Sequence, residues 1–344
     1  MKALVYEGPE ILKLREIPDV VPGPGQVRLR VTATGICGSD LAGYLGKTGR
    51  RTPPMVMGHE FGGVVESLGE GVTSLAPGDR VSVYPVEHCG VCPMCRSRRP
   101  MLCPDKKQYG VLTCNGSLAE FICVPERLCL KVPDHVSDEE AALVEPLAVS
   151  YRGVSALGEL KGRSVLVAGA GTIGLFAVAC ARAAGAEKIF CTDLLDNRLA
   201  IARRVGADVM INTGREDALE VIRGQLGGSL CDCAVECVGI TATADLSVRA
   251  VGFGGSVVWI GNNRPLVEIP MQSVVTMEKK IQGSFLYSME DFENALALIA
   301  GRQLDTGLFI TGRVAFEDAP EAFAKLSKDP GDHVKVIVRG AGLG

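Results

Sequence analysis

The stretch from Met57 to Gly63 places a histidine and a carboxylate, His59 and Glu60, side by side between glycines. The chain has only four histidines, and a histidine that is merely packed in a core needs neither an acidic neighbour nor flanking glycines. Upstream, Cys37 belongs to a second polar loop. Cysteine, histidine and glutamate are all zinc ligands, and a catalytic zinc usually takes three protein ligands and keeps one position open. We therefore interpret these residues as a candidate catalytic zinc site.

Taken one at a time, these residues have ordinary structural explanations. Cys37 alone would pass for a small buried hydrophobe, and His59 alone for a hydrogen-bonded core histidine. Asp40, in the same loop as the cysteine, could orient the histidine from behind a metal ion. The combination favours a metal site over separate structural roles.

Four further cysteines are spaced C-x2-C-x2-C-x7-C in a short segment that also contains glycine and proline: Cys89, Cys92, Cys95 and Cys103. Four thiolates fill every position of a tetrahedral zinc ion, which is typical of a structural site that leaves no room for substrate. An iron–sulfur cluster also takes four cysteines, but zinc is favoured here. The arginines within this segment are interpreted as a solvated basic rim.

A dinucleotide-binding pattern begins at residue 164. The apolar run from Ser164 to Ala168 predicts a buried strand, and the glycine-rich turn that follows it predicts the start of a helix. Asp193 follows a second apolar strand, where a carboxylate would accept hydrogen bonds from the adenosine ribose and repel a 2′-phosphate. NAD is therefore favoured over NADP, and Arg198 could cover the adenine. The candidate cofactor residues of the turn are Gly169, Gly171, Thr172, Ile173 and Gly174.

Composition excludes several other classes of function. With 47% apolar and 22% charged residues, the chain fits a soluble globular protein, and 344 residues favour two domains. A net charge of −4 gives no footprint for nucleic acid or for an anionic membrane. Thirteen cysteines is an odd number in a large chain, which predicts reduced thiols in a cytoplasmic protein instead of secreted disulfides. The first residues reach an acid and a turn before any signal-peptide apolar region forms, so export is not expected.

Periodicity predicts two kinds of architecture along the chain. Short alternating runs between glycine and proline turns predict a β-rich N-terminal domain. A helix is expected from Asp138 onward, and Pro146 is expected to break its hydrogen-bond ladder and turn Glu145 outward. From residue 162 to about 261, strands alternate with helices, which predicts an α/β fold with a doubly wound parallel sheet. The glycine cluster at 252–255 is expected to be a turn, and the apolar stretch 164–186 to be a strand and a helix instead of a membrane span.

Taken in order, these motifs resemble the zinc-dependent medium-chain dehydrogenase/reductase superfamily. The resemblance rests on five segments: Gly35-Ile36-Cys37-Gly38-Ser39-Asp40, Gly58-His59-Glu60, the four-cysteine lobe, Glu145-Pro146-Leu147 and the dinucleotide turn. Within that superfamily the polyol branch is indicated, which contains sorbitol, threonine and 2,3-butanediol dehydrogenases. The resemblance implies a GroES-like β-rich catalytic domain at 1–152 and 288–344, with a structural zinc lobe at 88–104, and a Rossmann domain at 153–287. It also implies a homo-oligomer, either a dimer or a tetramer.

The resemblance implies a role for each site residue. Cys37, His59 and Glu60 would bind the catalytic zinc, and Glu145 would bind it directly or through water. Ser39 would hydrogen-bond the reacting oxygen and pass on its proton. With two zinc ions per chain and NAD, the implied reaction turns a secondary alcohol or polyol into a ketone, because zinc acidifies the hydroxyl and the nicotinamide accepts the hydride.

Two departures from relatives bear on mechanism and substrate. Many relatives have a histidine where this chain has Ala42, so the outer end of the proton route is different here. Sorbitol dehydrogenases carry an arginine before the tyrosine that is here Tyr287, whereas this chain has Leu286, which favours a less polar or differently placed substrate. Candidate pocket residues are Tyr44, Arg50, Arg51 and Tyr287.

Two other functions remain open at the level of sequence. One is a zinc-free quinone or enoyl reductase of the same fold, which would have no need of Cys37, His59 and Glu145 together. The other is a non-enzymatic dinucleotide-sensing protein, which would need no open zinc position.

Overall fold

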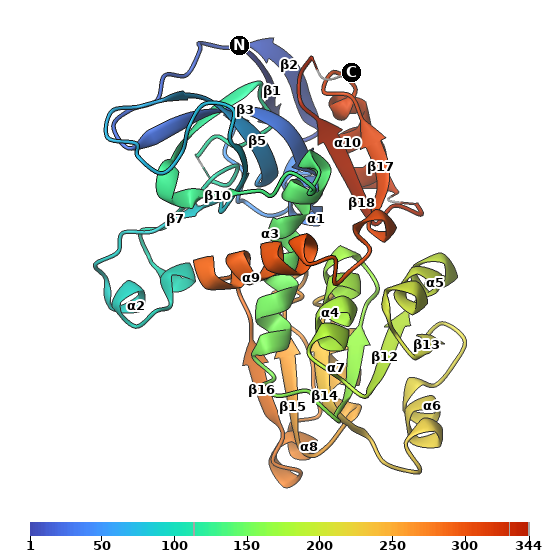
Figure 1. Cartoon of the computed structure of the whole chain (residues 1–344). Coiled ribbons are helices and arrows are strands. Elements are labelled where there is room, and N and C mark those ends of the chain that lie inside the picture. Colours follow the sequence, from blue (N-terminus) through green and yellow to red (C-terminus); the bar gives the residue numbers. More distant parts are fainter. Residues whose placement is uncertain (113, 330, 343–344) are drawn as a thin grey trace. The chain divides into compact units, whose positions relative to one another are not determined.

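The structure is a computed structural model that describes residues 1–112, 114–329 and 331–342. It divides into two compact units, coloured along the chain in Figure 1. The first unit comprises Met1–Glu145, Ser288–Gly301 and Ile310–Gly344, and the second comprises Pro146–Tyr287 and Arg302–Phe309. Among the described residues, no helix is long and apolar enough to cross a membrane.

The boundaries of the units differ from the expected division in two segments. Residues 146–152 and 302–309, which the sequence placed in the β-rich domain, belong to the second unit. The first difference arises because helix α3 (Asp138–Ser155) is continuous and passes from one unit into the other. The second arises because Phe309 stacks on Phe176 of the second unit, with ring centroids 4.0 Å apart.

A mixed sheet forms the centre of the first unit, with strand order β10-β6-β5-β3-β18-β17 and with β9 also paired to β3. Buried residues alternate with half-buried ones along the first part of β3, which places one face of that strand on the core. Its strands are β3 (Gln26–Gly35), β5 (Glu60–Leu68), β6 (Arg80–Val83), β9 (Phe121–Pro125), β10 (Cys129–Lys131), β17 (Ile310–Val314) and β18 (Lys335–Arg339). Two smaller sheets contain β1 (Lys2–Gly8), β2 (Ile11–Glu16) and β4 (Met55–Val56), and β7 (Val86–Glu87) with β8 (Lys107–Gln108).

The register of three neighbouring strands positions the candidate metal site. In the antiparallel pair of β3 and β5, Gly35 lies opposite Glu60. In the antiparallel pair of β3 and β18, the same glycine lies opposite Ile337. The last strand of the chain is therefore brought next to the strand that begins at Glu60.

Apart from α2, which buries no residue, the helices of the first unit pack apolar residues on the core. Tyr44 and Phe323 meet edge to face in this core, with ring centroids 5.9 Å apart. The helices are α1 (Gly38–Tyr44), α2 (Pro93–Arg96), the first part of α3, α9 (Met289–Ala300) and α10 (Ala319–Lys328), with short 3-10 helices at Pro100–Leu102 and Glu126–Leu128.

Pro146 interrupts the hydrogen-bond ladder of its helix without ending the helix. α3 runs from Asp138 to Ser155 with the proline in its interior. Both sides of the proline are anchored by buried apolar residues, such as Val144 and Leu147, so tertiary packing offsets the loss of one helical hydrogen bond. Glu145, directly before the proline, is buried, with 4% of its surface exposed.

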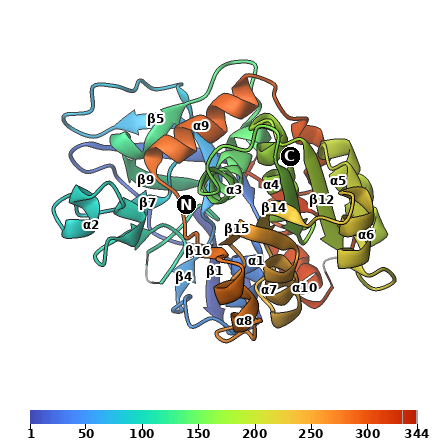
Figure 2. The same cartoon turned by 90° about the horizontal axis from the view of Figure 1, so that it is seen from below.

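The second unit is a parallel sheet covered by helices, as the sequence predicts. The strand order is β13-β12-β11-β14-β15-β16. The chain runs outward from β11 to β13 and then returns to place β14 on the other side of β11. Right-handed crossovers therefore place helices on both faces of the sheet, which Figure 2 shows from below. The strands are β11 (Ser164–Ala168), β12 (Lys188–Asp193), β13 (Val209–Asn212), β14 (Cys231–Glu236), β15 (Val251–Trp259) and β16 (Lys280–Gly283). The helices are the end of α3, α4 (Thr172–Ala183), α5 (Asp196–Val205), α6 (Ala218–Gln225), α7 (Thr241–Arg249) and α8 (Met271–Thr276), with a 3-10 helix at Thr306–Leu308.

One local expectation in this unit differs from the structure. The glycine cluster 252–255 lies inside strand β15, at a register shift against β14, and is not a turn between separate elements. Gly254 takes a left-handed φ of +66°, which lets the strand bulge without ending.

Candidate active site

Three side chains of the predicted metal site converge in the first unit. The ligand atoms of Cys37, His59 and Glu60 all lie within 4.8 Å of one another. His59 and Glu60 are buried, with 4% and 1% of their surface exposed, while the cysteine is half-buried. A thiol, an imidazole and a carboxylate at this separation fit a zinc ion that keeps a fourth position open.

The cysteine is held by the start of helix α1. Cys37 is the N-cap residue, and its backbone N–H donates to Asp40 Oδ2 in a capping box. Its Sγ accepts hydrogen bonds from the backbone N–H of Ser39 at 3.4 Å and from the hydroxyl of the same serine at 3.3 Å. The serine is exposed, and its hydroxyl lies beside the thiol. The solvent-facing side of the site therefore carries this hydroxyl.

A buried chain of charges lies behind the histidine. His59 Nδ1 is 3.3 Å from Asp40 Oδ1, and Arg51 Nη2 donates to the same oxygen at 2.6 Å. Burial raises the pKa of Asp40, but the neighbouring His59 and Arg51 outweigh burial and hold that pKa well below its ordinary value. The aspartate is therefore an anion that faces Nδ1 of the histidine, although the contact does not meet hydrogen-bond geometry, and Nε2 is left for a metal.

Arg51 was not expected in this role. Of the pocket candidates, Arg51, Tyr44 and Tyr287 are all buried, and only Arg50 is exposed. The hydroxyl of Tyr44 donates to the backbone carbonyl of Glu10 at 2.9 Å, as expected for a core tyrosine. The sequence contains no sign that Arg51 binds Asp40, because the two residues meet only in the folded chain.

The carboxylate of Glu60 has a buried cationic partner that sequence reasoning missed. Lys335 Nζ donates to Glu60 Oε2 at 2.6 Å, to Oε1 at 2.9 Å, and to the carbonyl oxygen of Ile36 at 3.0 Å. Burial lowers the pKa of this lysine, but the charges of Glu60, Cys37 and Glu145 outweigh burial and raise it. The only available signal was a lysine at the head of a strongly apolar strand, Lys335–Arg339.

Glu145 lies close to this cluster but stands apart from its centre. It is near enough to act on the charge of Lys335. Among the described residues, the group of mutually close ligand atoms comprises Cys37, His59 and Glu60 and does not include it. Its proposed contact with a metal, direct or through water, stays a prediction.

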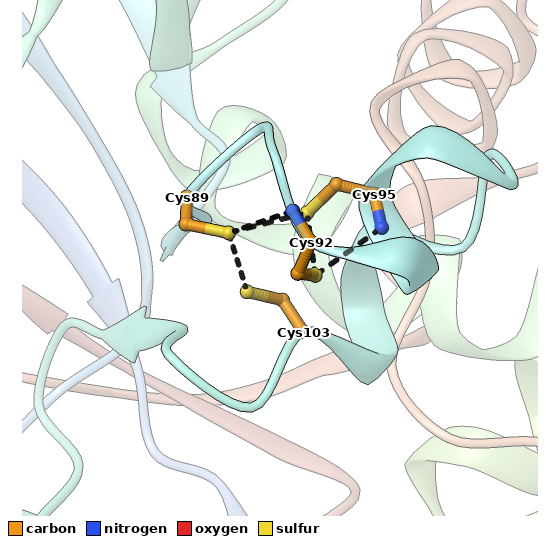
Figure 3. A group of neighbouring side chains, drawn as sticks. All are labelled: Cys89, Cys92, Cys95 and Cys103. Carbon is orange, nitrogen blue, oxygen red and sulfur yellow. Dashed lines mark hydrogen bonds between the residues drawn. The ribbon is translucent and has the colours of Figure 1, made fainter.

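The four-cysteine lobe forms a compact sulfur cluster, shown in Figure 3. The sulfurs of Cys92 and Cys95 are 3.5 Å apart, those of Cys89 and Cys103 are 3.5 Å apart, and those of Cys89 and Cys95 are 4.0 Å apart. Zinc–sulfur bonds of about 2.3 Å in a tetrahedron place the sulfurs roughly 3.8 Å from one another. The lobe therefore fits a single zinc ion. An iron–sulfur cluster contains several irons and bridging sulfides, and its cysteines must stand farther apart.

The surroundings of the lobe shift the pKa values of two of its thiols in opposite directions. Backbone N–H groups of Val91 and Cys92 lower the pKa of Cys89 to about 7. Burial, helped by the neighbouring thiol of Cys92, raises the pKa of Cys95 to about 12. His88 Nδ1 lies 3.7 Å from the sulfur of Cys95 as an outer partner.

In the second unit, the glycine turn leaves an open space at the start of α4. Gly169 has a left-handed φ of +100°, and a Cβ at Gly174 would collide with its carbonyl oxygen. A Cβ at Gly171, by contrast, would meet nothing within 4 Å. The turn thus requires glycine for closure at two positions and leaves the third facing free space, where a pyrophosphate would meet the helix N-terminus.

The carboxylate at the end of β12 is held next to this turn. Asp193 Oδ2 accepts a hydrogen bond from the backbone N–H of Ala170 at 2.7 Å. Its Oδ1 accepts from the backbone N–H groups of Leu194 and Leu195 at 2.8 and 3.0 Å. Within the described part of the chain, the buried Nε of Arg198 has no hydrogen-bond partner. These two side chains fit the edge of a nucleotide site.

Comparison with known proteins connects both sites to one family. Residues 23–134 match the model for the alcohol dehydrogenase GroES-like domain, and residues 172–301 match that for zinc-binding dehydrogenases. Sorbitol dehydrogenase from Ovis aries is 34% identical over 341 residues, which cover 98% of this chain and 96% of that protein.

Two solved structures are similar over nearly the whole chain. A putative zinc-binding dehydrogenase from Sinorhizobium meliloti 1021 bound to NADP superposes with a TM-score of 0.92 at 31% identity, covering 98% of both chains. An alcohol dehydrogenase from Escherichia coli CFT073 in complex with NADH has a TM-score of 0.91 at 29% identity, covering 98% of this chain and 99% of the other.

This chain belongs to the zinc-dependent medium-chain dehydrogenases, in their polyol branch. The predicted α/β class, with a GroES-like domain and a Rossmann domain, is confirmed. The class comprises NAD-dependent enzymes that act on CH–OH groups and use zinc.

Proposed function

We propose that this protein transfers a hydride between NAD(H) and a secondary alcohol or polyol, with Cys37, His59 and Glu60 as ligands of a catalytic zinc. The observation that carries the proposal is the convergence of these three side chains beside the exposed hydroxyl of Ser39. The likeness to a sorbitol dehydrogenase supports the polyol class.

The residues divide the chemistry between them. When bound, zinc would acidify the substrate hydroxyl and the nicotinamide would accept the hydride. Ser39 would receive the hydroxyl proton, because its side chain lies beside the thiol on the exposed side of the site. The side chain of Ala42 has no group that can carry this proton further. The proton would therefore leave through water or through the cofactor ribose.

A substrate panel tests the class of reaction. Purified protein would be assayed with NAD against free polyols, phosphorylated polyols and simple diols, and against quinones with a reduced cofactor. We expect reduction of NAD by at least one secondary alcohol and loss of that activity with a strong chelator. Quinone reduction that survives the chelator would favour the zinc-free reductase, and NAD binding without any turnover would favour a sensor.

NAD is proposed as the cofactor because of Asp193, although one similar structure holds NADP. The carboxylate is fixed by three backbone N–H groups and would stand against a 2′-phosphate. We expect Asp193→Ala to weaken NAD about tenfold or more while leaving NADP unchanged or tighter. The exposed Asp196 provides the control, since Asp196→Ala should change neither constant. Equal losses for both cofactors with Asp193→Ala would refute the choice.

We also propose that the chain assembles into a homo-oligomer through the free edge of the second unit's sheet. β16 is the last strand of that sheet and is largely exposed. An unpaired strand edge recruits another strand, and apolar residues nearby strengthen such a contact. These exposed residues are Leu266, Met271, Val275 and Phe285. Light scattering should give a dimer or tetramer that Met271→Glu weakens, and a monomer in the unmodified protein would refute the proposal.

A cytoplasmic location is proposed on the state of the cysteines. All thirteen are free thiols in the structure, and both metal sites require thiolates. Fractionation should place the protein with cytoplasmic markers, and recovery with secreted proteins would refute the location.

A further inference from the structure

Lys335 is a buried cation that the proposed reaction does not use. Its ammonium group has three N–H donors, and all three are directed to acceptors: both oxygens of Glu60 and the carbonyl oxygen of Ile36. The two side chains are 3% and 1% exposed, so water does not screen the pair. The positive charge of the lysine therefore acts on Glu60 with little screening by solvent.

The sheet provides a path for this contact. Glu60 on β5 lies opposite Gly35 on β3, and Gly35 lies opposite Ile337 on β18. Lys335 precedes Ile337 by two positions and shares its face of the strand. A Cβ at Gly35 would collide with Glu60 Oε2. The glycine thus leaves the space through which Glu60 reaches over the middle strand toward the lysine.

The same carboxylate is one of the three converging metal-ligand groups. An ionised carboxylate has about four lone-pair positions, so a lysine and a metal ion can bind it together. A positive charge within hydrogen-bond distance of both oxygens nevertheless reduces their attraction for a second cation, and the effect is strong in a buried site. Cys37 also lies within reach of the charge of Lys335, but among the three ligand groups only Glu60 accepts hydrogen bonds from the lysine in the described structure.

We propose that Lys335 is a positioning residue that weakens Glu60 as a metal ligand and keeps this carboxylate displaceable by the substrate oxygen. The inference rests on the proposed catalytic metal site. The alternative is that the lysine only ties β18 to β5. A structural tie predicts lower stability when it is removed but gives no reason for metal affinity to rise.

Metal affinity separates these roles. Zinc dissociation constants at the Cys37 site would be measured by chelator competition for the unmodified protein, Lys335→Met and Lys335→Arg. We expect Lys335→Met to bind zinc about tenfold more tightly, because Glu60 loses the cation that repels a second one, and Lys335→Arg to stay close to the unmodified protein. Arg339→Met is the matched control, since it removes an exposed cation from the same strand and should leave the constant unchanged.

Cobalt substitution gives a readout that a structural role would not move. The visible d–d spectrum of Co²⁺ at this site should change in Lys335→Met as the carboxylate binds more closely, and should not change in Arg339→Met. Should Lys335→Met fail to fold, Lys335→Gln keeps hydrogen-bond donors without the charge and should shift affinity and spectrum in the same direction. A folded Lys335→Met or Lys335→Gln variant that binds zinc no more tightly than the unmodified protein would overturn the inference.

The same measurements distinguish a failure of the proposed function from a failure of the role proposed for Lys335. Unmodified protein that takes up no metal at the Cys37 site refutes the proposed function. Unmodified protein that binds metal there, together with a neutral variant at Lys335 that binds it equally well, refutes only the role of the lysine.

Discussion

His59 and Glu60 are adjacent in sequence, yet each is tied to a different buried charge. His59 faces Asp40, which is itself bound by Arg51, and Glu60 is bound by Lys335. The two partners come from separate parts of the fold, Asp40 from helix α1 and Lys335 from the last strand. The positions of the proposed ligands are thus fixed from two independent directions, as a site with one open coordination position requires.

Arg51→Met tests the support behind the histidine. The variant leaves Asp40 as a buried carboxylate without its closest cation, the guanidinium at 2.6 Å. Removing one member of a buried ion pair typically costs about 3–5 kcal/mol of stability, which chemical denaturation followed by circular dichroism would measure. The neighbouring Arg50 is exposed, so Arg50→Met should change stability by less than about 0.5 kcal/mol. Equal effects of the two variants would contradict the assignment.

For single residues, the sequence indicated which side chains are candidate metal ligands, but it did not indicate which buried residues contact those ligands. Cys37, His59 and Glu60 could be chosen because their types and neighbours are unusual for structural residues. Lys335 could not be chosen, because its contact depends on the register of three strands and spans 275 positions. Arg51 was named only as one of four pocket candidates, and its contact with Asp40 is formed by residues 11 positions apart that no local pattern joins.

Single elements carry the cofactor and the structural metal. In the turn before α4, Gly174 and Gly171 belong to one motif but have different surroundings. A Cβ at the first would strike the backbone, and a Cβ at the second would point into open space. The motif therefore combines a packing requirement with a binding requirement.

Alanine substitutions should separate these two requirements. We expect Gly174→Ala to destabilise the fold by about 1–3 kcal/mol, because the backbone must shift to admit a methyl group. Gly171→Ala should keep the thermal midpoint of the unmodified protein yet lower NAD affinity about tenfold, because its methyl group occupies the space proposed for the pyrophosphate. Calorimetry and NAD titration give both quantities. Gly171→Ala with normal NAD affinity would show that the cofactor lies elsewhere.

The cysteine lobe should depend on its metal more than on packing. Of its four cysteines only Cys103 is buried, and the lobe's sole regular helix is the four-residue α2. We expect Cys103→Ser to reduce zinc from about two ions per chain to about one and to raise hydrogen exchange within 88–104. Cys123→Ser, which changes a cysteine on β9, is the control and should leave both measurements unchanged.

Element boundaries show where local rules were overridden. The capping signal at Ser137 and Asp138 correctly predicted the start of α3, and the helix continues past Pro146 because apolar anchors on both sides hold it. The glycine cluster at 252–255 failed as a turn because its neighbours continue to pair with β14 across a bulge. Tertiary contacts, which a local pattern does not contain, decided both cases.

For the whole molecule, the alternation of strands and helices was enough to predict the parallel sheet, and the clustered turns were enough to predict the β-rich unit. The edges of the units were less predictable. Residues 302–309 return to the second unit through the stacking of Phe309 on Phe176, a contact between residues far apart in sequence. The pairing of β18 with β3 likewise returns the C-terminal strand to the metal site.

The most direct test of the account is zinc content and turnover in Cys37→Ser, measured beside the unmodified protein. Elemental analysis and NAD reduction with the best polyol of the panel would be carried out on the same samples. The account predicts about two zinc ions and measurable turnover for the unmodified protein, and about one zinc ion with turnover lowered at least 100-fold for the variant. A Cys37→Ser variant that keeps both zinc ions, or that keeps full activity, would contradict the central claim.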